Sequence, residues 1–241
     1  MIQKLILGDC LEKMAEIPDG SVDMVLTDPP YGTTACKWDT IIPFEPMWKQ
    51  LKRIVKKNGA IVLFCSQPFT SALVMSNPKA FRYSWVWIKN KPVGHLNAKR
   101  RPMNGVEDVV IFCFGKESYY PQGLKPYEKV IKRKGCSSGP YRDCAENTVQ
   151  THTGYPRTDI KFSHDTSVGH PTQKPVLLME YLLKTYTSEG ETVLDFTMGS
   201  GTTCLAAKNL GRQFIGIEQE EKYYNIANKR IFGENAPLVV I

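Results

Sequence analysis

The chain has 241 residues, of which 42% are hydrophobic, enough for one core with a small appended module. Its net charge of +7 favours a polyanionic partner, although charge alone does not establish a nucleic acid. We find neither a run of transmembrane length nor the features of a signal peptide. The seven cysteines lack the short regular spacing of a secreted disulfide scaffold, so we expect a reduced, cytoplasmic protein without membrane contact.

Strand and helix signals alternate along most of the chain. Such alternation is typical of a mostly parallel sheet, and the last two strands of the first half can form an antiparallel hairpin at its edge. The predicted strands are residues 4–7, 22–27, 60–65, 83–88, 106–114, 192–195 and 214–217. The predicted helices are residues 10–17, 44–57, 68–75, 176–186 and 221–232, with a further helix that ends at residue 210.

Residues 116–165 interrupt this alternation. The segment is rich in Gly, Pro, Ser, Thr, Tyr and Lys, has little periodicity, and is too long for an ordinary connection. We therefore predict an α/β fold, namely a Rossmann-like, doubly wound, mostly parallel sheet of seven strands with an antiparallel edge hairpin and an irregular insert. The insert would divide one domain into two halves, residues 1–115 and residues 166–241.

The strand at residues 22–27 runs into the motif Asp28-Pro29-Pro30-Tyr31. Open α/β sheets place their sites at the carboxyl ends of strands, which is where this motif falls. Each proline fixes φ at about −65° and lacks an N–H donor, so the turn is stiff and holds its carbonyl groups in place. A carboxylate, fixed carbonyls and a flat ring suit the binding of a planar amine. The simpler alternative is that Asp28 is an ordinary turn acid.

A second motif follows the strand at residues 192–195 and opens a helix. It reads Asp195-Phe196-Thr197-Met198-Gly199-Ser200-Gly201-Thr202, and its glycines permit a sharp turn at a helix N-terminus. It lacks the lysine of a P-loop and the third glycine of a dinucleotide fingerprint. A nucleoside such as S-adenosylmethionine needs only this turn and an acid at the end of the next strand, where Glu218 stands.

Basic residues gather in the insert, in residues 90–103, and in the loop after Tyr31. Interspersed with aromatic residues, they suit contact with phosphates and bases, although a solvated surface would look similar. The candidate DNA-binding residues are Lys37, Trp38, Lys91, Lys99, Arg100, Arg101, Lys132, Arg133 and Lys134. We predict no metal site, because Cys136, Cys144, His152 and His164 do not have the compact spacing of a zinc site.

Taken in order, these motifs resemble the amino-methyltransferases of DNA, in the permuted arrangement called the β class. In that family the catalytic Asp-Pro-Pro-Tyr comes first, a target-recognition region follows, and the cofactor loop comes last. Asp28–Tyr31, residues 116–165 and residues 195–202 have this order. The resemblance implies a target-recognition insert, S-adenosylmethionine as cofactor and double-stranded DNA as partner. The sequence departs from the family at Phe196, where a proline is common, and this puts the role of Phe196 in doubt.

The resemblance also implies roles for individual residues. Asp28 and the carbonyl of Pro29 would accept hydrogen bonds from the target amine, while Pro30 and Tyr31 would pack on the base. The residues expected to bind the cofactor are Asp9, Cys10, Asp28, His170, Thr172, Lys174, Asp195, Phe196, Gly199, Ser200, Gly201, Thr202 and Glu218.

We expect methyl transfer to N6 of a flipped-out adenine by direct in-line displacement. In the family, an aspartate at the first motif position accompanies adenine more often than cytosine, so cytosine N4 is the close alternative. Methylation of cytosine carbon 5 is disfavoured, because none of the seven cysteines follows a proline. RNA or protein amide methylation and a non-catalytic DNA-binding role are more distant alternatives. A homodimer and a cognate restriction endonuclease are expected by analogy.

The permuted order makes a prediction about the two ends of the chain. In a doubly wound fold, a parallel strand should follow the helix at residues 221–232, but no such strand is predicted there. Residues 4–7 can fill that position. We therefore predict that the N-terminal strand lies beside the last strand, residues 214–217, in one sheet.

Overall fold

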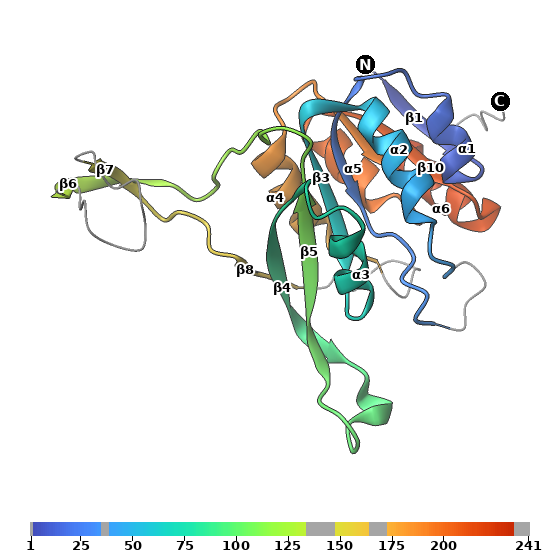
Figure 1. Cartoon of the computed structure of the whole chain (residues 1–241), viewed down its shortest axis with the longest axis horizontal. Helices are drawn as coiled ribbons and strands as arrows, with labels where there is room; N and C mark the ends of the chain where they lie inside the picture. Colours follow the sequence, from blue (N-terminus) through green and yellow to red (C-terminus); the bar gives the residue numbers. More distant parts are fainter. Residues whose placement is uncertain (1, 35–38, 134–147, 164–172, 234–241) are drawn as a thin grey trace. The chain divides into compact units, whose positions relative to one another are not determined.

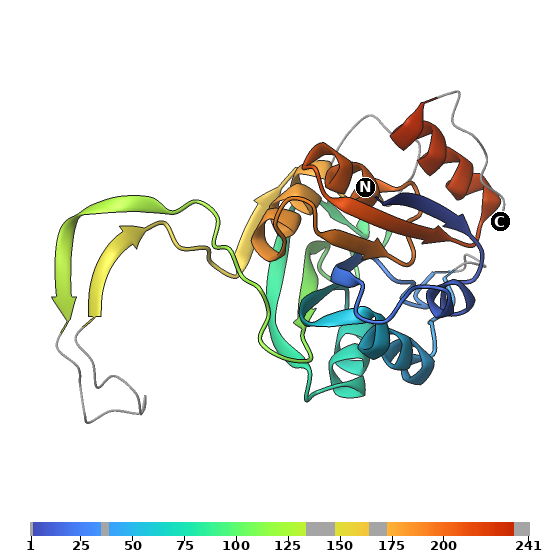
Figure 2. The ribbon, with the colours of Figure 1, turned by 90° about the horizontal axis from the view of Figure 1, so that it is seen from above.

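The computed structural model describes residues 2–34, 39–133, 148–163 and 173–233 (Figure 1). The chain divides into two compact units, one formed by residues 1–120 together with 158–241 and the other by residues 121–157. The first unit is an open sheet with helices packed on both faces, as the turned view shows (Figure 2).

The described part of the first unit has eight strands in its sheet, in the order β1-β10-β9-β2-β3-β5-β4-β8. All neighbours pair in parallel except β5, which runs antiparallel to both β3 and β4. The doubly wound α/β fold is therefore confirmed. The predicted antiparallel hairpin of β4 and β5 is present, but it does not form the edge of the sheet, because β8 pairs with β4 there. The strands are β1 (Gln3–Leu7), β2 (Val22–Thr27), β3 (Val55–Cys65), β4 (Phe81–Val93), β5 (Asn104–Phe112), β8 (Asp159–Phe162), β9 (Thr192–Asp195) and β10 (Gln213–Glu218).

The prediction of seven strands was wrong because β8 lies within the segment taken for an insert. Its four residues, Asp-Ile-Lys-Phe, pair in parallel with β4 from Val86 to Lys89. Ile160 is buried against the sheet, and the indole N–H of Trp87 donates to the carbonyl of Phe162 at 3.0 Å. A strand with only two apolar residues, in a region rich in Gly and Pro, gives too weak a pattern to predict.

The predicted pairing of the N-terminal strand with the last strand is confirmed. β1 pairs in parallel with β10, from Gln3 opposite Phe214 to Leu7 opposite Glu218. The amide of Gly8 then donates to the carbonyl of Glu218 at 2.9 Å. This register brings the turn after β1 beside the end of β10, at the edge where the two sequence motifs also lie.

Six helices of the described residues cover the two faces of the sheet. One face packs against α1 (Cys10–Ala15), α2 (Phe44–Ile54) and α3 (Phe69–Ser76), and the other against α4 (Val176–Tyr186), α5 (Thr202–Asn209) and α6 (Glu221–Phe232). Successive residues of a strand point to opposite faces of the sheet. Met24 therefore packs in the core beneath α4, α5 and α6, and Val25 in the core beneath α1, α2 and α3. None of the helices in the described ranges is long and apolar enough to span a membrane.

The helix predicted over residues 44–57 is shorter in the structure. α2 ends at Ile54, and β3 begins at once with Val55, whose backbone is extended. Asn58 and Gly59 suggested a helix end, but they lie inside β3. A Cβ atom at Gly59 would lie 2.7 Å from the carbonyl oxygen of Asp23, so the glycine allows β3 to approach β2 closely.

The described residues of the second unit, 121–133 and 148–157, are less irregular than predicted. They contain β6 (Lys125–Arg133) and β7 (Thr148–Thr153), which pair antiparallel with Arg133 opposite Thr148. The unit is also narrower than the predicted insert of residues 116–165, because both ends of that segment belong to the first unit.

Candidate active site

A cavity of about 1080 Å³ opens where the carboxyl ends of the parallel strands meet. Both sequence motifs line it: Asp28, Pro29, Pro30 and Tyr31 follow β2, and most of the glycine loop follows β9. Its volume is slightly above the usual range for small-molecule sites, about 300 to 1,000 Å³. The other predicted residues in its lining are Asp9, Cys10, Arg101, Lys174, Phe196, Gly199, Ser200, Thr202 and Glu218.

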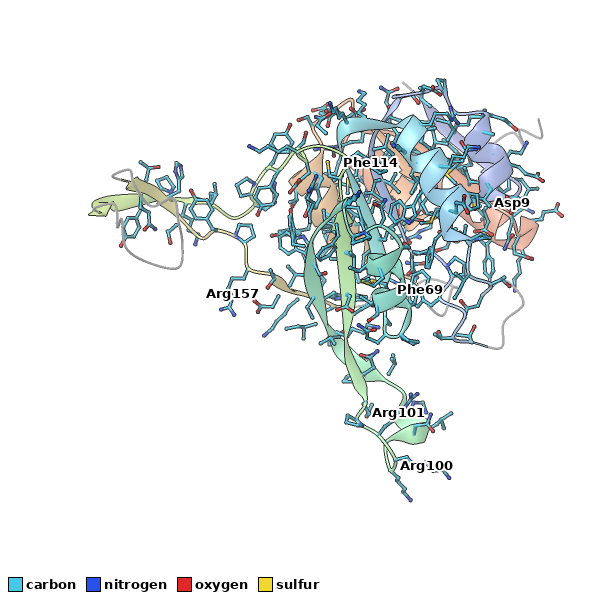
Figure 3. All side chains as sticks on the ribbon, in the orientation of Figure 1. Asp9, Phe69, Arg100, Arg101, Phe114 and Arg157 are labelled. Carbon is cyan, nitrogen blue, oxygen red and sulfur yellow. The ribbon has the colours of Figure 1, made fainter. Side chains whose placement is uncertain are left out.

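The Asp28 carboxylate is held from two sides. Its Oδ1 accepts a short hydrogen bond from the hydroxyl of Tyr31, and its Oδ2 forms an ion pair with Lys174. The ring of Tyr31 stacks on Phe69 of α3, labelled in Figure 3, with centroids 5.2 Å apart. The carbonyl of Asp28 accepts a hydrogen bond from Thr197 Oγ1 at 3.2 Å, which ties the Asp-Pro-Pro-Tyr turn to the glycine loop.

Lys174 connects Asp28 to a second carboxylate that the sequence did not reveal. Its ammonium lies 2.9 Å from Oε1 of Glu107 on β5, and the other oxygen of Glu107 lies 2.6 Å from the ammonium of Lys89 on β4. Asp28 is 28% exposed, whereas the side chains of Glu107, Lys174 and Lys89 are all less than 10% exposed. We call Asp28, Tyr31, Lys89, Glu107 and Lys174 the carboxylate cluster.

Burial and the neighbouring charges set the ionisation of this cluster. Burial raises the pKa of Asp28; Lys174 opposes this rise and Glu107 adds to it. Burial would also raise the pKa of Glu107, but Lys174 and Lys89 outweigh it and lower that pKa. Burial would lower the pKa of Lys174, yet the two carboxylates raise it, so the lysine stays charged. The cluster thus holds two cations and two carboxylates that balance each other.

The glycine loop forms the other part of the lining. Gly199 and Gly201 both have positive φ angles, 51° and 76°. The amide of Gly199 donates to Oε2 of Glu218 at 2.9 Å, and the amide of Glu220 donates to Oε1 at 2.8 Å. We call residues 195–202 together with Glu218 the glycine-loop cluster. The hydrogen bond from Gly199 fixes the loop backbone just before α5, which begins at Thr202.

Two predicted cofactor residues lie behind this surface and do not line the cavity. Asp195 is buried and accepts a hydrogen bond from Thr27 Oγ1 at 2.5 Å and one from the amide of Thr197 at 3.2 Å. Burial raises the pKa of Asp195 to about 6. Gly201 packs against α6, where a Cβ atom would lie 2.9 Å from the Cβ of Ala227. Both residues therefore support the conformation of the glycine loop without lining the cavity.

Asp9 and Cys10 lie where β1 meets α1, and Asp9 is labelled in Figure 3. The Asp9 carboxylate caps α1, accepting hydrogen bonds from the amides of Leu11 and Glu12 at 2.8 and 3.2 Å. Burial raises the pKa of the Cys10 thiol to about 12, so that side chain is neutral. Asp9 therefore has a structural task besides its place in the cavity lining.

The cavity has features that fit an S-adenosyl nucleoside. The Gly199 position leaves open space, because a Cβ atom there would contact nothing within 4 Å. Glu218 stands at the end of β10, as a ribose-binding acid requires. Gln173 lines the cavity, and its buried Nε2 has no hydrogen-bond partner among the described residues, so a polar ligand group could satisfy it.

Asp39 is a further residue that the sequence did not reveal. It accepts hydrogen bonds from four consecutive backbone amides, from Tyr31 to Thr34, at 2.6 to 2.9 Å. Burial would raise the pKa of Asp39, but these bonds and that of the Thr34 side chain outweigh it and lower the pKa. The residue fixes the chain as it leaves the Asp-Pro-Pro-Tyr turn. No short motif marked it, because an isolated aspartate after a polar loop is common.

The basic residues of the β4–β5 hairpin are placed beyond the main sheet. Lys91, Lys99, Arg100 and Arg101 are exposed, and Figure 3 shows Arg100 and Arg101 at the far end of this hairpin, which includes a short 3-10 helix (His95–Asn97). A projecting, positively charged hairpin suits contact with phosphates. Arg101 also lines the cavity.

Several predicted residues lie outside the described residues: Lys37, Trp38, Lys134, His170 and Thr172. Lys132 and Arg133 belong to β6 in the second unit. Of the four residues weighed as a zinc site, only His152 is described. The described ranges contain no group of three or more His, Cys, Asp or Glu side chains placed to hold a metal ion.

Comparison with known proteins gives one family match over most of the chain. The family described as DNA methylase matches residues 22–229. The chain is 29% identical to the type II methyltransferase M1.MboII of Moraxella bovis, over 94% of this chain and 95% of that protein. It is 26% identical to the putative methylase YubD of Escherichia coli K12, over 95% of this chain and 90% of that protein.

Solved structures agree with this match. The M1.HpyAVI–SAM complex superposes with a TM-score of 0.65 at 26% identity, covering 96% of this chain and 100% of that chain. The PvuII cytosine-N4-specific DNA methyltransferase superposes with a TM-score of 0.71 at 16% identity, covering 97% of this chain and 87% of that chain. This match establishes the common fold. Fold and sequence thus define the class of DNA methyltransferases that act on exocyclic amines. The chain belongs to the DNA methylase family of the N6/N4 type, which confirms the resemblance stated from the sequence.

Proposed function

We propose that this DNA methyltransferase transfers a methyl group from S-adenosylmethionine to N6 of an adenine in duplex DNA. The observation that carries the proposal is the cavity where the two clusters adjoin. The glycine-loop cluster offers a nucleoside site, and beside it the Asp28 carboxylate offers an acceptor for an amine. Asp28 at the first motif position favours adenine over cytosine by resemblance to the family.

Asp28 and Pro29 would make the amine reactive. The lone pair of an adenine amino group is delocalised into the ring, so the nitrogen is a poor nucleophile. If one N–H donates to the Asp28 carboxylate and the other to the Pro29 carbonyl, the nitrogen becomes pyramidal and its lone pair is freed. In the described structure Tyr31 and Lys174 occupy the two oxygens of Asp28, so one contact must be exchanged or shared when the amine binds.

Transfer would be a single in-line displacement. S-adenosylmethionine supplies an electrophilic methyl group on a sulfonium. The amine lone pair forms the new N–C bond while the sulfur keeps the electron pair of the breaking S–C bond. An N–H proton is then released, and the Asp28 carboxylate is placed to accept it at the oxygen that holds the amine and to pass it to solvent. Positioning and electrostatics provide most of the acceleration in such a step.

The predicted cofactor residues would share the nucleoside between them. Glu218 would bind the ribose hydroxyls, and Gly199 would let the backbone approach closely. Lys174 and Gln173, which line the cavity, would meet the cofactor carboxylate, and this would compete with the contact of Lys174 to Asp28. The exposed basic hairpin and the unit at residues 121–157 would bind and read the duplex, from which the base must be flipped.

The test is transfer of label from methyl-labelled S-adenosylmethionine to mixed-sequence duplex DNA, followed by digestion to nucleosides. Label in N6-methyladenine supports the proposal. Label in N4-methylcytosine would identify cytosine, and not adenine, as the target base. DNA binding without transfer of label would contradict an enzymatic role. Matched reactions with RNA and with no nucleic acid exclude other acceptors. A homodimer, a cognate restriction endonuclease and a cytoplasmic location remain predictions.

A further inference from the structure

We propose that Glu107 is a positioning residue for methyl transfer, because it balances the charge of Lys174 and so leaves Asp28 available to the target amine. This inference rests on the proposed function. Glu107 lies on β5, far in sequence from both motifs, and is 6% exposed. Its two oxygens contact different lysines, Oε1 Lys174 at 2.9 Å and Oε2 Lys89 at 2.6 Å, and Oε1 also accepts from the hydroxyl of Tyr31 at 3.2 Å.

Lys174 needs this balance because of where it lies. Its side chain is 8% exposed, and its ammonium contacts the carboxylate of Asp28 directly. A buried ammonium requires anionic partners, and without Glu107 that requirement would fall on Asp28 alone. A carboxylate bound so tightly to a cation is a weaker acceptor for the N–H of an amine. Glu107 thus shares the lysine and frees part of the Asp28 acceptor capacity.

The same balance matters while the methyl group moves. As the N–C bond forms, positive charge passes from the sulfonium to the amine nitrogen beside Asp28. An uncompensated ammonium at Lys174 would repel that charge, whereas the Lys174–Glu107 pair presents little net charge to it. Lys89 and Tyr31 hold Glu107 in this position: Lys89 binds its second oxygen, and the hydroxyl of Tyr31 donates to Oε1 at 3.2 Å.

Glu107→Gln is the direct test, since the amide keeps the size of the side chain and removes its charge. The proposal expects kcat to fall by about 10- to 100-fold. The dissociation constant for S-adenosylmethionine, measured by calorimetry without DNA, and the KM for DNA should each change by less than about threefold. Asp108→Asn is the matched control: Asp108 is the next residue on β5, its Oδ2 accepts from Thr70 at 2.9 Å, and its loss should leave kcat within about threefold.

A double variant distinguishes charge balance from a purely structural role. If Glu107 acts by balancing Lys174, removal of both charges in Glu107→Gln/Lys174→Met should cost less kcat than the product of the two single losses, at saturating cofactor. Two independent structural losses would multiply. If a thermal unfolding scan shows that Glu107→Gln is not folded, Glu107→Asp and Glu107→Asn replace it. Glu107→Asp keeps the charge and should retain at least about five times the kcat of Glu107→Asn.

A wild-type protein that methylates DNA, with a Glu107→Gln variant that keeps kcat within about threefold, would overturn the inference and leave the proposed function intact. Losses that multiply in the double variant would also overturn it. A wild-type protein that transfers no label to DNA would instead contradict the proposed function, so the two failures are distinguishable.

Discussion

The two clusters that line the cavity are built in different ways. The glycine-loop cluster consists of one contiguous segment and one acid, fixed by backbone amides such as that of Gly199. The carboxylate cluster brings together side chains from β4, β5 and two loops, with Lys174 and Asp28 146 positions apart in the chain. The first depends on backbone shape and the second on balanced charges. Substitutions in the first should therefore affect cofactor affinity, and those in the second should affect rate.

Asp28→Ala should give the largest effect and the clearest separation of reaction rate from cofactor affinity. Removing the acceptor for the amine is expected to lower kcat by about 1,000-fold. The dissociation constant for S-adenosylmethionine should change by less than about tenfold, because the glycine-loop cluster is intact. Single-turnover kinetics and calorimetry measure the two quantities. Full turnover by the variant would refute the mechanism.

Gly201→Ala should destabilise the glycine-loop cluster where it packs against α6. The residue has a φ of 76°, and a Cβ atom would lie 2.8 Å from Ile231 Cδ1, so strain and overlap together should cost about 3 kcal/mol of unfolding free energy. Gly199→Ala is the control, with a φ of 51° but no atom within 4 Å of the new Cβ. It should cost only about 1 kcal/mol. Thermal unfolding of both variants tests this order, and equal losses would contradict it.

Glu218→Gln should separate affinity from rate in the opposite direction to Asp28→Ala. The amide cannot accept as strongly from the ribose hydroxyls or from the amide of Gly199, so the dissociation constant for S-adenosylmethionine should rise about tenfold. At saturating cofactor, kcat should stay within about threefold of the wild-type value. Glu221→Gln, at an exposed position in the first turn of α6, is the control and should change neither. A selective loss of kcat would show that the clusters are not separable.

Asp195→Asn should give the smallest effect, visible as a dependence on pH. Burial raises the pKa of Asp195 to about 6, above that of the unfolded chain, so the folded protein binds this proton more tightly. The contribution of Asp195 to stability therefore increases as pH falls through about 6. The unfolding free energy of the wild type, relative to the variant, should rise by about 1 kcal/mol between pH 7 and pH 5. Denaturant titrations at both values measure it, and a constant difference would contradict it.

The same contrast explains what the sequence could predict. The glycine loop, Glu218 and the Asp-Pro-Pro-Tyr turn follow strands directly, so local patterns place them at the carboxyl edge of the sheet. Glu107 belongs to a strand predicted as residues 106–114 from its apolar residues, and its partners come from β4 and from Lys174. No local pattern marks such a contact. It becomes visible only when the register of β4 and β5 places Trp87 opposite Glu107.

The strands show the same limit. Five of the seven predicted strands lie within two residues of their actual bounds, β4 extends five residues beyond its predicted end, and β1 was placed beside β10 from the order of the elements. β3 began five residues earlier than predicted, since Asn58 and Gly59 are tolerated inside it by its close approach to β2. β8 was missed because its pairing with β4, and not its own composition, makes it a strand.

The pairing of β1 with β10 has a consequence for how the protein is made. Ile2 and Gln213, which hydrogen bond at this junction, are 211 positions apart in the chain. A ribosome that adds about 5 to 20 residues per second needs roughly 10 to 40 s to pass from one to the other. For that time β1 has no partner on the strand edge that β10 later covers. A chaperone that binds extended apolar segments would find this edge on nascent chains and lose it once β10 has paired with β1.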